Sequence, residues 1–113
     1  MKIQPVLTSC EMQMTHIQSP QLRSETLLEL LKVERENAKN NTLNNKTFTS
    51  VELSNDMDKN ELMYQLNYAI LLLTDYQKTQ SFSIALPSKA YSKEFADKLN
   101  SIKDSIETVV NKQ

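Results

Sequence analysis

Glycine is absent from this chain of 113 residues, although average usage would place roughly eight glycines in a chain of that length. Tight hairpin turns and phosphate-binding loops depend on glycine, because its backbone enters the left-handed region without steric cost. The absence therefore argues against a sheet-rich fold. It also excludes the glycine-rich fingerprints of P-loop and dinucleotide-binding proteins.

Cysteine and histidine occur once each, as Cys10 and His16. A single cysteine excludes an intrachain disulfide framework, and a structural zinc site would have to draw its other ligands from carboxylates. A Cys–His nucleophile pair would need a segment that fixes its geometry, and this region shows none. We therefore expect no enzyme activity, no metal and no cofactor, while the role of Cys10 stays open.

A charge excess of one sign and long apolar runs are also missing. The net charge is −1 with both signs interspersed, which argues against nucleic-acid binding. The longest apolar run, YAILLL at residues 68–73, is far too short to span a bilayer, and the N-terminus lacks the apolar core of a signal peptide. We expect a small soluble protein that is cytoplasmic, or exported without a cleavable signal peptide.

The patterns that are present predict a mainly α fold of three helices. Residues 1–18 carry little charge, and Cys10, Met12 and Met14 alternate with polar residues. That period of two suits an extended segment, so we predict a flexible N-terminal arm or a short strand there. Residues 19–113 are predicted to form a single helical domain.

The first predicted helix begins with Ser19 as its cap and Pro20 in its first turn. It carries a leucine-rich face from Leu27 to Leu31. The Asn-rich segment 37–46 is predicted to be a loop, because asparagine side chains compete with the backbone for hydrogen bonds.

Two further helices are predicted in the C-terminal half. The second, at about 58–80, is apolar on most sides and is the candidate for the centre of the fold. The third, at about 88–111, has an apolar seam that favours packing on the second helix over a self-associating coiled coil. The connecting segments 47–53 and 81–86 leave room for short strands. The predicted packing positions, within the fold or with a partner, are Leu66, Ile70, Leu73, Phe95, Leu99, Ile102 and Ile106.

One stretch, DMDKNE at residues 56–61, opens like a calcium-binding EF-hand loop. Such a loop needs glycine at its sixth position and a bidentate glutamate at its twelfth. Glu61 and Asn67 occupy those positions, so we predict no metal site. Asp58 and Glu61 instead form a D-x-x-E pattern typical of a capping box, which predicts a helix start with Asp58 as the cap.

The C-terminal half opens with a polar break, NDMDKNELM, that leads into a helix. It closes with a second helix, SIKDSIETVVNKQ, in which residues 106–109 are the most similar part. In this arrangement it resembles the inner-rod and needle subunits of bacterial type III secretion systems. The segment SFSIALPSKAYSKEF departs from that family, which has a short turn between the helices. The resemblance implies an assembly subunit without a cofactor, which polymerises through these helices and keeps a mobile N-terminal arm.

We therefore predict a non-enzymatic helical protein–protein interaction protein, and an assembly subunit of a bacterial secretion apparatus if the resemblance holds. The alternatives are a chaperone or adaptor for another protein, and a small regulator that binds and inhibits one. In each case the expected partner is a protein or a second copy of the chain.

Overall fold

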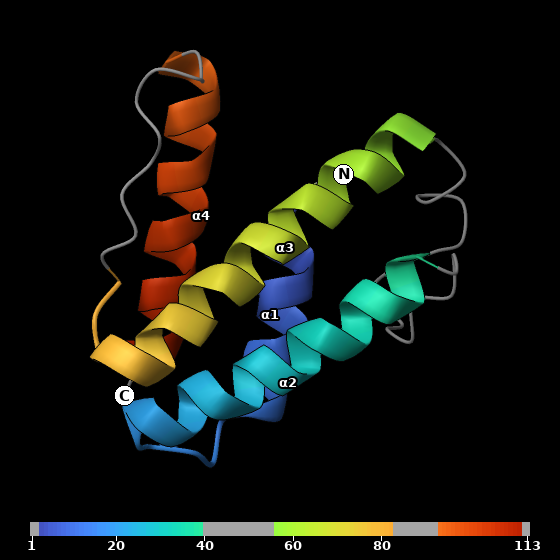
Figure 1. The fold of residues 1–113 in the computed structure, drawn as a ribbon. Helices are drawn as coiled ribbons and strands as arrows, with labels where there is room; N and C mark the ends of the chain where they lie inside the picture. The colour runs from blue at the N-terminus through green and yellow to red at the C-terminus, as the bar shows by residue number, and fades with distance from the viewer. Residues whose placement is uncertain (1–2, 40–55, 83–92, 112–113) are drawn as a thin grey trace.

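The computed structural model describes residues 3–39, 56–82 and 93–111, which are mainly α-helical. Within these residues the helices are α1 (Gln4–Gln13), α2 (Pro20–Lys39), α3 (Asp56–Thr79) and α4 (Lys93–Asn111), as Figure 1 shows. The predicted mainly α class is confirmed, with one more helix than predicted. None of the described residues lies in a strand. The strand candidate 47–53 lies outside them, as does 81–86 apart from Ser81 and Phe82.

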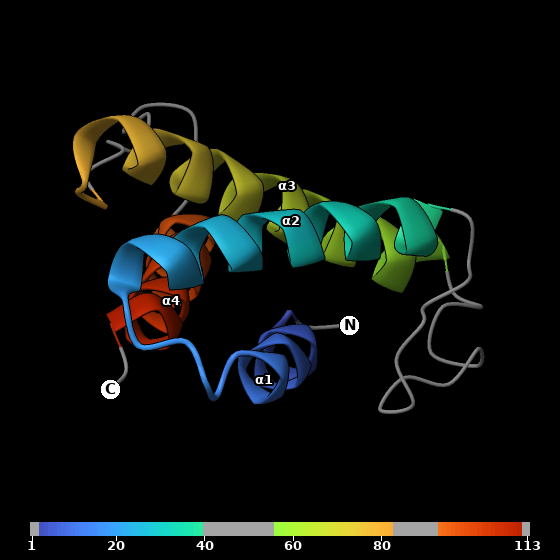
Figure 2. The same cartoon turned by 90° about the horizontal axis from the view of Figure 1, so that it is seen from below.

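The helices form two layers. In Figure 2, α2 and α3 lie side by side in one layer, and α1 and α4 lie in the other. The α2–α3 pair is antiparallel, because Gln21 near the start of α2 bonds to Gln77 near the end of α3. Further along α2, Arg35 Nη1 donates to Asn67 Oδ1 at 3.0 Å. This register brings the leucine face of α2 onto α3.

The core lies between the layers and draws apolar side chains from every described helix. Leu27, Leu31 and Leu66 have no solvent-exposed surface, and burying such a side chain stabilises a fold by about 1.5–3 kcal/mol. Most predicted packing positions lie in this core, namely Leu66, Ile70, Leu73, Leu99, Ile102 and Ile106. The side chain of Phe95 lies outside the described part.

The predicted N-terminal arm is wrong, because α1 is a helix that packs into the core. The buried residues of α1 and of the two positions that flank it are Ile3, Val6, Leu7, Cys10 and Met14. Their spacing follows the period of an α-helix. The apparent alternation of Cys10, Met12 and Met14 misled the prediction, since Met12 is 72% exposed while the other two are buried. Pro5 lies in the first turn of α1, where a proline is tolerated. The predicted boundary at residue 18 therefore does not separate an arm from the core.

Several helix ends also differ from the predictions. Residues 37–39 belong to α2 instead of the predicted loop, whose remainder lies outside the described residues. The α3 helix begins at Asp56, so Asp58 lies within its first turn and is not the cap that the capping-box pattern predicted. The described part of α4 starts at Lys93, and the predicted residues 88–92 lie outside it. Acidic residues favour the first turn of a helix as well as its cap. The capping-box pattern therefore placed the start of α3 two residues late.

Candidate functional site

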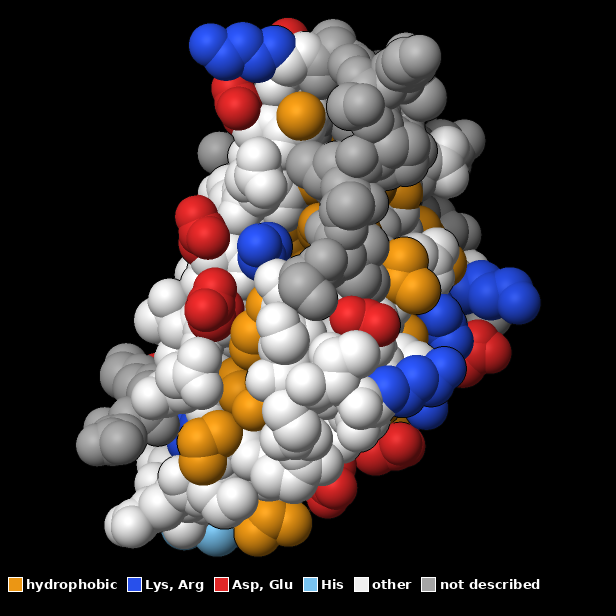
Figure 3. Space-filling model, turned by 60° about the vertical axis from the view of Figure 1, so that its left-hand side comes forward, with side chains coloured by type: hydrophobic (Ala, Val, Ile, Leu, Met, Phe, Trp, Pro, Cys, Tyr) orange, Lys and Arg blue, Asp and Glu red, His pale blue; other side chains and the backbone are white. Residues whose placement is uncertain are grey.

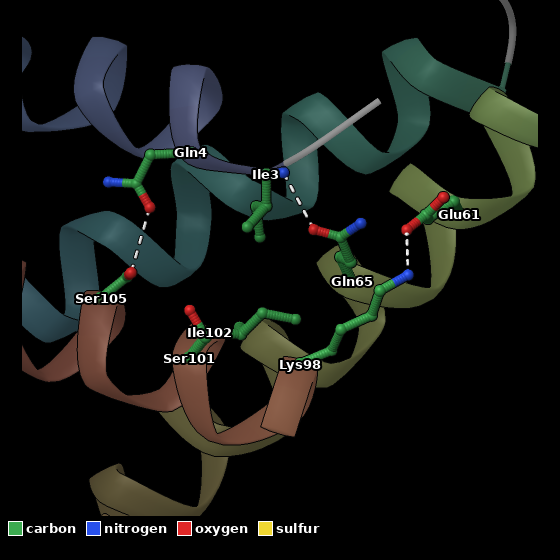
Figure 4. Close-up of a pocket in the computed structure, with 8 residues that line it drawn as sticks. All are labelled: Ile3, Gln4, Glu61, Gln65, Lys98, Ser101, Ile102 and Ser105. Atoms are coloured by element: carbon green, nitrogen blue, oxygen red, sulfur yellow. Dashed lines mark hydrogen bonds and ion pairs between the residues drawn. The ribbon is translucent and has the colours of Figure 1, made fainter. Parts of the chain in front are cut away.

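A pocket of about 210 Å³ opens between the first residues of α1 and the facing sides of α3 and α4. Figure 4 shows the side chains of these three elements converging on it. We call it the α1–α3–α4 pocket; its lining residues are Ile3, Gln4, Glu61, Gln65, Lys98, Ser101, Ile102 and Ser105. The pocket therefore joins segments that are far apart in the sequence.

Two hydrogen bonds attach the start of α1 to the walls of the pocket. The backbone N–H of Ile3 donates to Gln65 Oε1 of α3 at 2.9 Å in a buried position. The Ser105 hydroxyl of α4 donates to Gln4 Oε1 at 3.0 Å. Because the first N–H groups of a helix have no partner within the helix, the Gln65 side chain supplies an acceptor that the local sequence of α1 does not provide.

An ion pair crosses the rim of the pocket from α4 to α3. Lys98 Nζ lies 2.8 Å from Glu61 Oε1, and this hydrogen bond is the main cause that raises the pKa of Lys98. Both side chains are substantially exposed, so salt screens the pair and water competes for it. An exposed pair of this kind contributes little to stability.

The inner wall of the pocket is apolar, because Ile3 and Ile102 line it and both are almost fully buried. The rim is formed by serine, glutamine and charged side chains, and serine and glutamine can both donate and accept hydrogen bonds. The lining therefore combines two apolar side chains with six polar or charged ones. Among the described residues, no group of three or more His, Cys, Asp or Glu side chains could hold a metal ion.

The Cys10 thiol and His16 do not form a catalytic pair. Cys10 is buried in the core while His16 is exposed after the end of α1. Burial, with a smaller effect from the charge of Glu34, raises the pKa of Cys10 to about 12. The thiol therefore stays protonated at neutral pH, and the thiol form is a poor nucleophile.

A second polar feature lies on the inner faces of α2 and α3. Glu34 Oε2 and the Tyr68 hydroxyl are buried and have no hydrogen-bond partner among the residues that the structure describes. Burial raises the pKa of Glu34 and the pKa of Tyr68. A buried polar group without a hydrogen-bond partner is costly.

The Arg23 side chain joins three parts of the fold from a position that is 4% exposed. Its Nη1 donates to the carbonyl oxygens of Met14 and Ile17, each at 2.9 Å. Its Nε donates to the carbonyl oxygen of Val109 near the end of α4 at 2.8 Å. The ends of α1 and α4 carry unpaired carbonyls and a negative dipole, so the guanidinium satisfies both.

Exposed apolar side chains are scattered over the described helices. The large ones are Met12 of α1, Leu22 and Val33 of α2, and Leu71 of α3. On the face in Figure 3, apolar atoms form small patches between interspersed basic and acidic side chains. No single large apolar patch dominates this face (Figure 3). We therefore take the α1–α3–α4 pocket as the candidate binding site.

Most of the pocket was not predicted from the sequence. Glu61 was assigned to the capping box and Ile102 to the seam, and both line the pocket. No sequence pattern indicated the bond between Lys98 and Glu61, which lie 37 residues apart in the chain. Gln4, Gln65, Ser101 and Ser105 gave no signal, because an isolated glutamine or serine in a helical pattern has no distinctive spacing.

Comparison with known proteins identifies no relative of this chain. No family model matches it, and neither a curated protein nor a solved structure matches it. Among the helices that the structure describes, none is long and apolar enough to cross a membrane.

Proposed function

We propose that this protein is a non-enzymatic helical interaction protein that binds a segment of another protein at the α1–α3–α4 pocket. The observation that carries the proposal is the construction of the pocket, which has an apolar floor beneath polar side chains from three helices. Such a site suits an apolar side chain flanked by peptide groups, because Ile3 and Ile102 can cover the side chain while the hydroxyl of the exposed Ser101 bonds the backbone.

A buried, protonated Cys10 supports a binding role over nucleophilic catalysis. The exposed ion pair of Lys98 and Glu61 supports it too, because a weak pair at the rim can be exchanged for contacts with a partner. The function is therefore that of an adaptor, a chaperone or a small regulator of another protein.

Assembly into a bacterial secretion apparatus stays a prediction. It requires the seam of α4 to bind neighbouring subunits, yet Leu99, Ile102 and Ile106 already pack in the core of a single chain. Polymerisation through these residues would require the fold to open. We therefore favour the adaptor or regulator, in which the described core stays closed.

The test compares two neighbouring arginine substitutions on α4. Ser101→Arg places a large charged side chain in the pocket, whereas Asn100→Arg places it at an exposed position that does not line the pocket. We expect immobilised wild-type protein and N100R to capture the same partner from source lysate, and S101R to lose it. Binding of the purified partner would then be measured by calorimetry.

Circular dichroism controls for folding of both variants. Equal partner binding by S101R and N100R would contradict the proposed site. Light scattering on the wild type addresses the assembly hypothesis separately, since a growing polymer would favour a subunit over an adaptor.

A further inference from the structure

A ring of side-chain hydrogen bonds joins the start of α2 to the end of α3. Gln21 Nε2 donates to Gln77 Oε1 at 2.6 Å, and Gln77 Nε2 donates to Ser24 Oγ at 2.8 Å. The Ser24 hydroxyl donates to the carbonyl oxygen of Gln21 at 2.7 Å, which closes the ring. We call these three residues the α2–α3 polar ring.

The α2–α3 polar ring satisfies a hydroxyl that the fold buries completely. Ser24 has no exposed surface, and within the ring its hydroxyl both accepts and donates a hydrogen bond. A buried hydroxyl that lost these partners would be costly. The ring therefore favours the one arrangement of α2 and α3 that keeps it closed.

The apolar contact between α2 and α3 selects their register far less sharply. These two helices lie alongside each other (Figure 1) and share the most extensive contact between described helices. Residues four apart lie on the same face of a helix, and hydrophobic burial has no directional preference. A slip of one turn would therefore place apolar side chains against most of the same positions. The buried pairs spaced by four residues are Leu27 and Leu31 on α2, and Leu62 and Leu66, Leu66 and Ile70, Ala69 and Leu73, and Leu72 and Tyr76 on α3.

This apolar repeat is interrupted at the α2–α3 polar ring. Gln77 lies four residues after Leu73, and Ser24 lies four residues before Leu28. Because the helices are antiparallel, a slip of one turn in one direction places Ser24 against Leu73. A slip in the other direction places Gln77 against Leu28. Either slip therefore sets a polar side chain of the ring against a leucine.

We propose that the α2–α3 polar ring sets the register of the two helices, and that their apolar faces alone accept a slip of one helix turn. Buried polar groups that fix the register of packed helices do so at little net gain in stability. The ring is therefore a conformational lock.

The α1–α3–α4 pocket depends on this lock, because α3 supplies Glu61 and Gln65 to its lining. The α1 helix packs on α2 and α4. If α3 slipped along α2 by one turn while α1 kept its place, the Gln65 acceptor would move about 5 Å away from the N–H of Ile3. The inference goes beyond the proposed function, since it concerns the isolated chain.

The test replaces the whole ring by apolar side chains, as Gln21→Leu, Ser24→Ala and Gln77→Leu in one chain. Spin labels are attached through Glu36→Cys and Lys78→Cys, at exposed positions near the ends of α2 and α3. In an antiparallel pair these labels lie at opposite ends, so a slip of one turn changes their separation by about 5 Å. Double electron–electron resonance should give one distance with the ring intact and two distances, about 5 Å apart, without it.

Two features of the labelled chain make the distances interpretable. Both the parent and the ring variant carry Cys10→Ala, which removes the single native cysteine. The matched control is Gln13→Leu, which places the same apolar side chain at an exposed position of α1. This control should keep the single distance of the parent.

Urea unfolding supplies an independent readout of the same inference. Gln77→Leu alone leaves Gln21 and Ser24 each without one partner, whereas the ring variant removes the polar groups on both sides. An unsatisfied polar group costs more than the loss of the whole bond. The single variant should therefore unfold at a lower urea concentration than the ring variant, and circular dichroism should show that both remain helical.

A single, unchanged distance in the ring variant would mean that the apolar faces fix the register, and the inference would be wrong. It would also be wrong if the ring variant lost its helicity or unfolded at a lower urea concentration than Gln77→Leu, since the ring would then supply net stability. Neither result bears on the proposed function, because S101R and N100R test partner binding in a chain whose ring is intact.

Discussion

Glu34 carries a polar atom that the described fold buries without a partner. Its Oε2 has no hydrogen bond among the described residues, and burial raises its pKa from the ordinary value of 4.5. On α2 it lies three residues after Leu31 and four before Ala38, both without exposed surface. Residues at these separations share a helix face, so the carboxyl group lies between two fully buried positions.

Glu34→Gln should therefore increase stability at neutral pH. A raised folded-state pKa means that Glu34 contributes most stability below the unfolded value of about 4.5, and that this contribution is lost as the pH rises through the folded value. The gain of the variant over wild type should be largest at pH 7 and shrink toward pH 4.5. Urea unfolding across this range measures it.

The control for this substitution is Glu36→Gln, which removes the same charge from an exposed position of α2. Its difference from wild type should not follow that trend. If the two variants show the same dependence on pH, then the ionisation of Glu34 is not penalised by the fold.

Gln80 shows how the chain manages without glycine at a helix end. It follows α3 with a φ of 60°, in the left-handed region that glycine occupies at no steric cost. Its N–H donates to the carbonyl of Tyr76 at 2.8 Å, and its Nε2 donates to Gln21 Oε1 at 2.6 Å. These bonds offset the unfavourable backbone conformation, which costs about 1–2 kcal/mol for a residue with a Cβ atom.

The α3 helix shows the same apolar run in two environments. Leu71 is 54% exposed, whereas its neighbours Leu72 and Leu73 have no exposed surface. The sequence predicted a helix that is apolar on most sides, and the structure leaves one side of the run YAILLL exposed at Leu71. The position of each leucine around the helix axis decides whether it is buried, and therefore how much it contributes to the free energy of unfolding.

Two truncations on α3 measure that difference. Leu73→Ala should lower the free energy of unfolding by about 2–5 kcal/mol, because it removes buried surface and leaves a cavity. Leu71→Ala should change it by less than about 0.5 kcal/mol. Denaturant unfolding gives both values, and equal losses would show that the outer face of α3 is covered in solution.

Arg23 acts at the scale of the whole molecule, because it connects α2 with the ends of α1 and α4. These links reach across 9 residues to Met14 and 86 residues to Val109. They tie one layer of helices to the other. The arginine had no recognisable signal in the sequence, since a single basic residue in a helix is ordinarily solvated.

Arg23→Met keeps an unbranched apolar stem but removes the guanidinium donors, and should destabilise the protein by about 3 kcal/mol because the carbonyls that Arg23 contacts lose a charged donor. Arg35→Met removes an exposed bond to Asn67 and should cost less than about 1 kcal/mol. Thermal unfolding monitored by circular dichroism compares them. A similar small loss for both would mean that Arg23 does not hold the two layers together.

The sequence predicted the class of the fold and most of its packing residues, because apolar spacing is a local property. The leucines of α2 and the apolar residues of the α4 seam recur at the period of an α-helix and not at the period of a strand. Helix ends were less well predicted, as Asp58 shows, because acidic residues favour several positions near a helix start. The segment of α1 was assigned the wrong period because Met12, an exposed methionine, counted as apolar.

The sequence by itself determined that the chain forms helices, which of their faces are apolar, and that glycine-dependent sites are excluded. Only the tertiary structure decided which faces meet and which polar groups share a site. The contacts that build the pocket join Ile3 to Gln65 across 62 residues and Gln4 to Ser105 across 101. No local pattern records such pairs, because they form only when the buried faces of α1, α3 and α4 bring the helices together. The α1–α3–α4 pocket is therefore a product of packing.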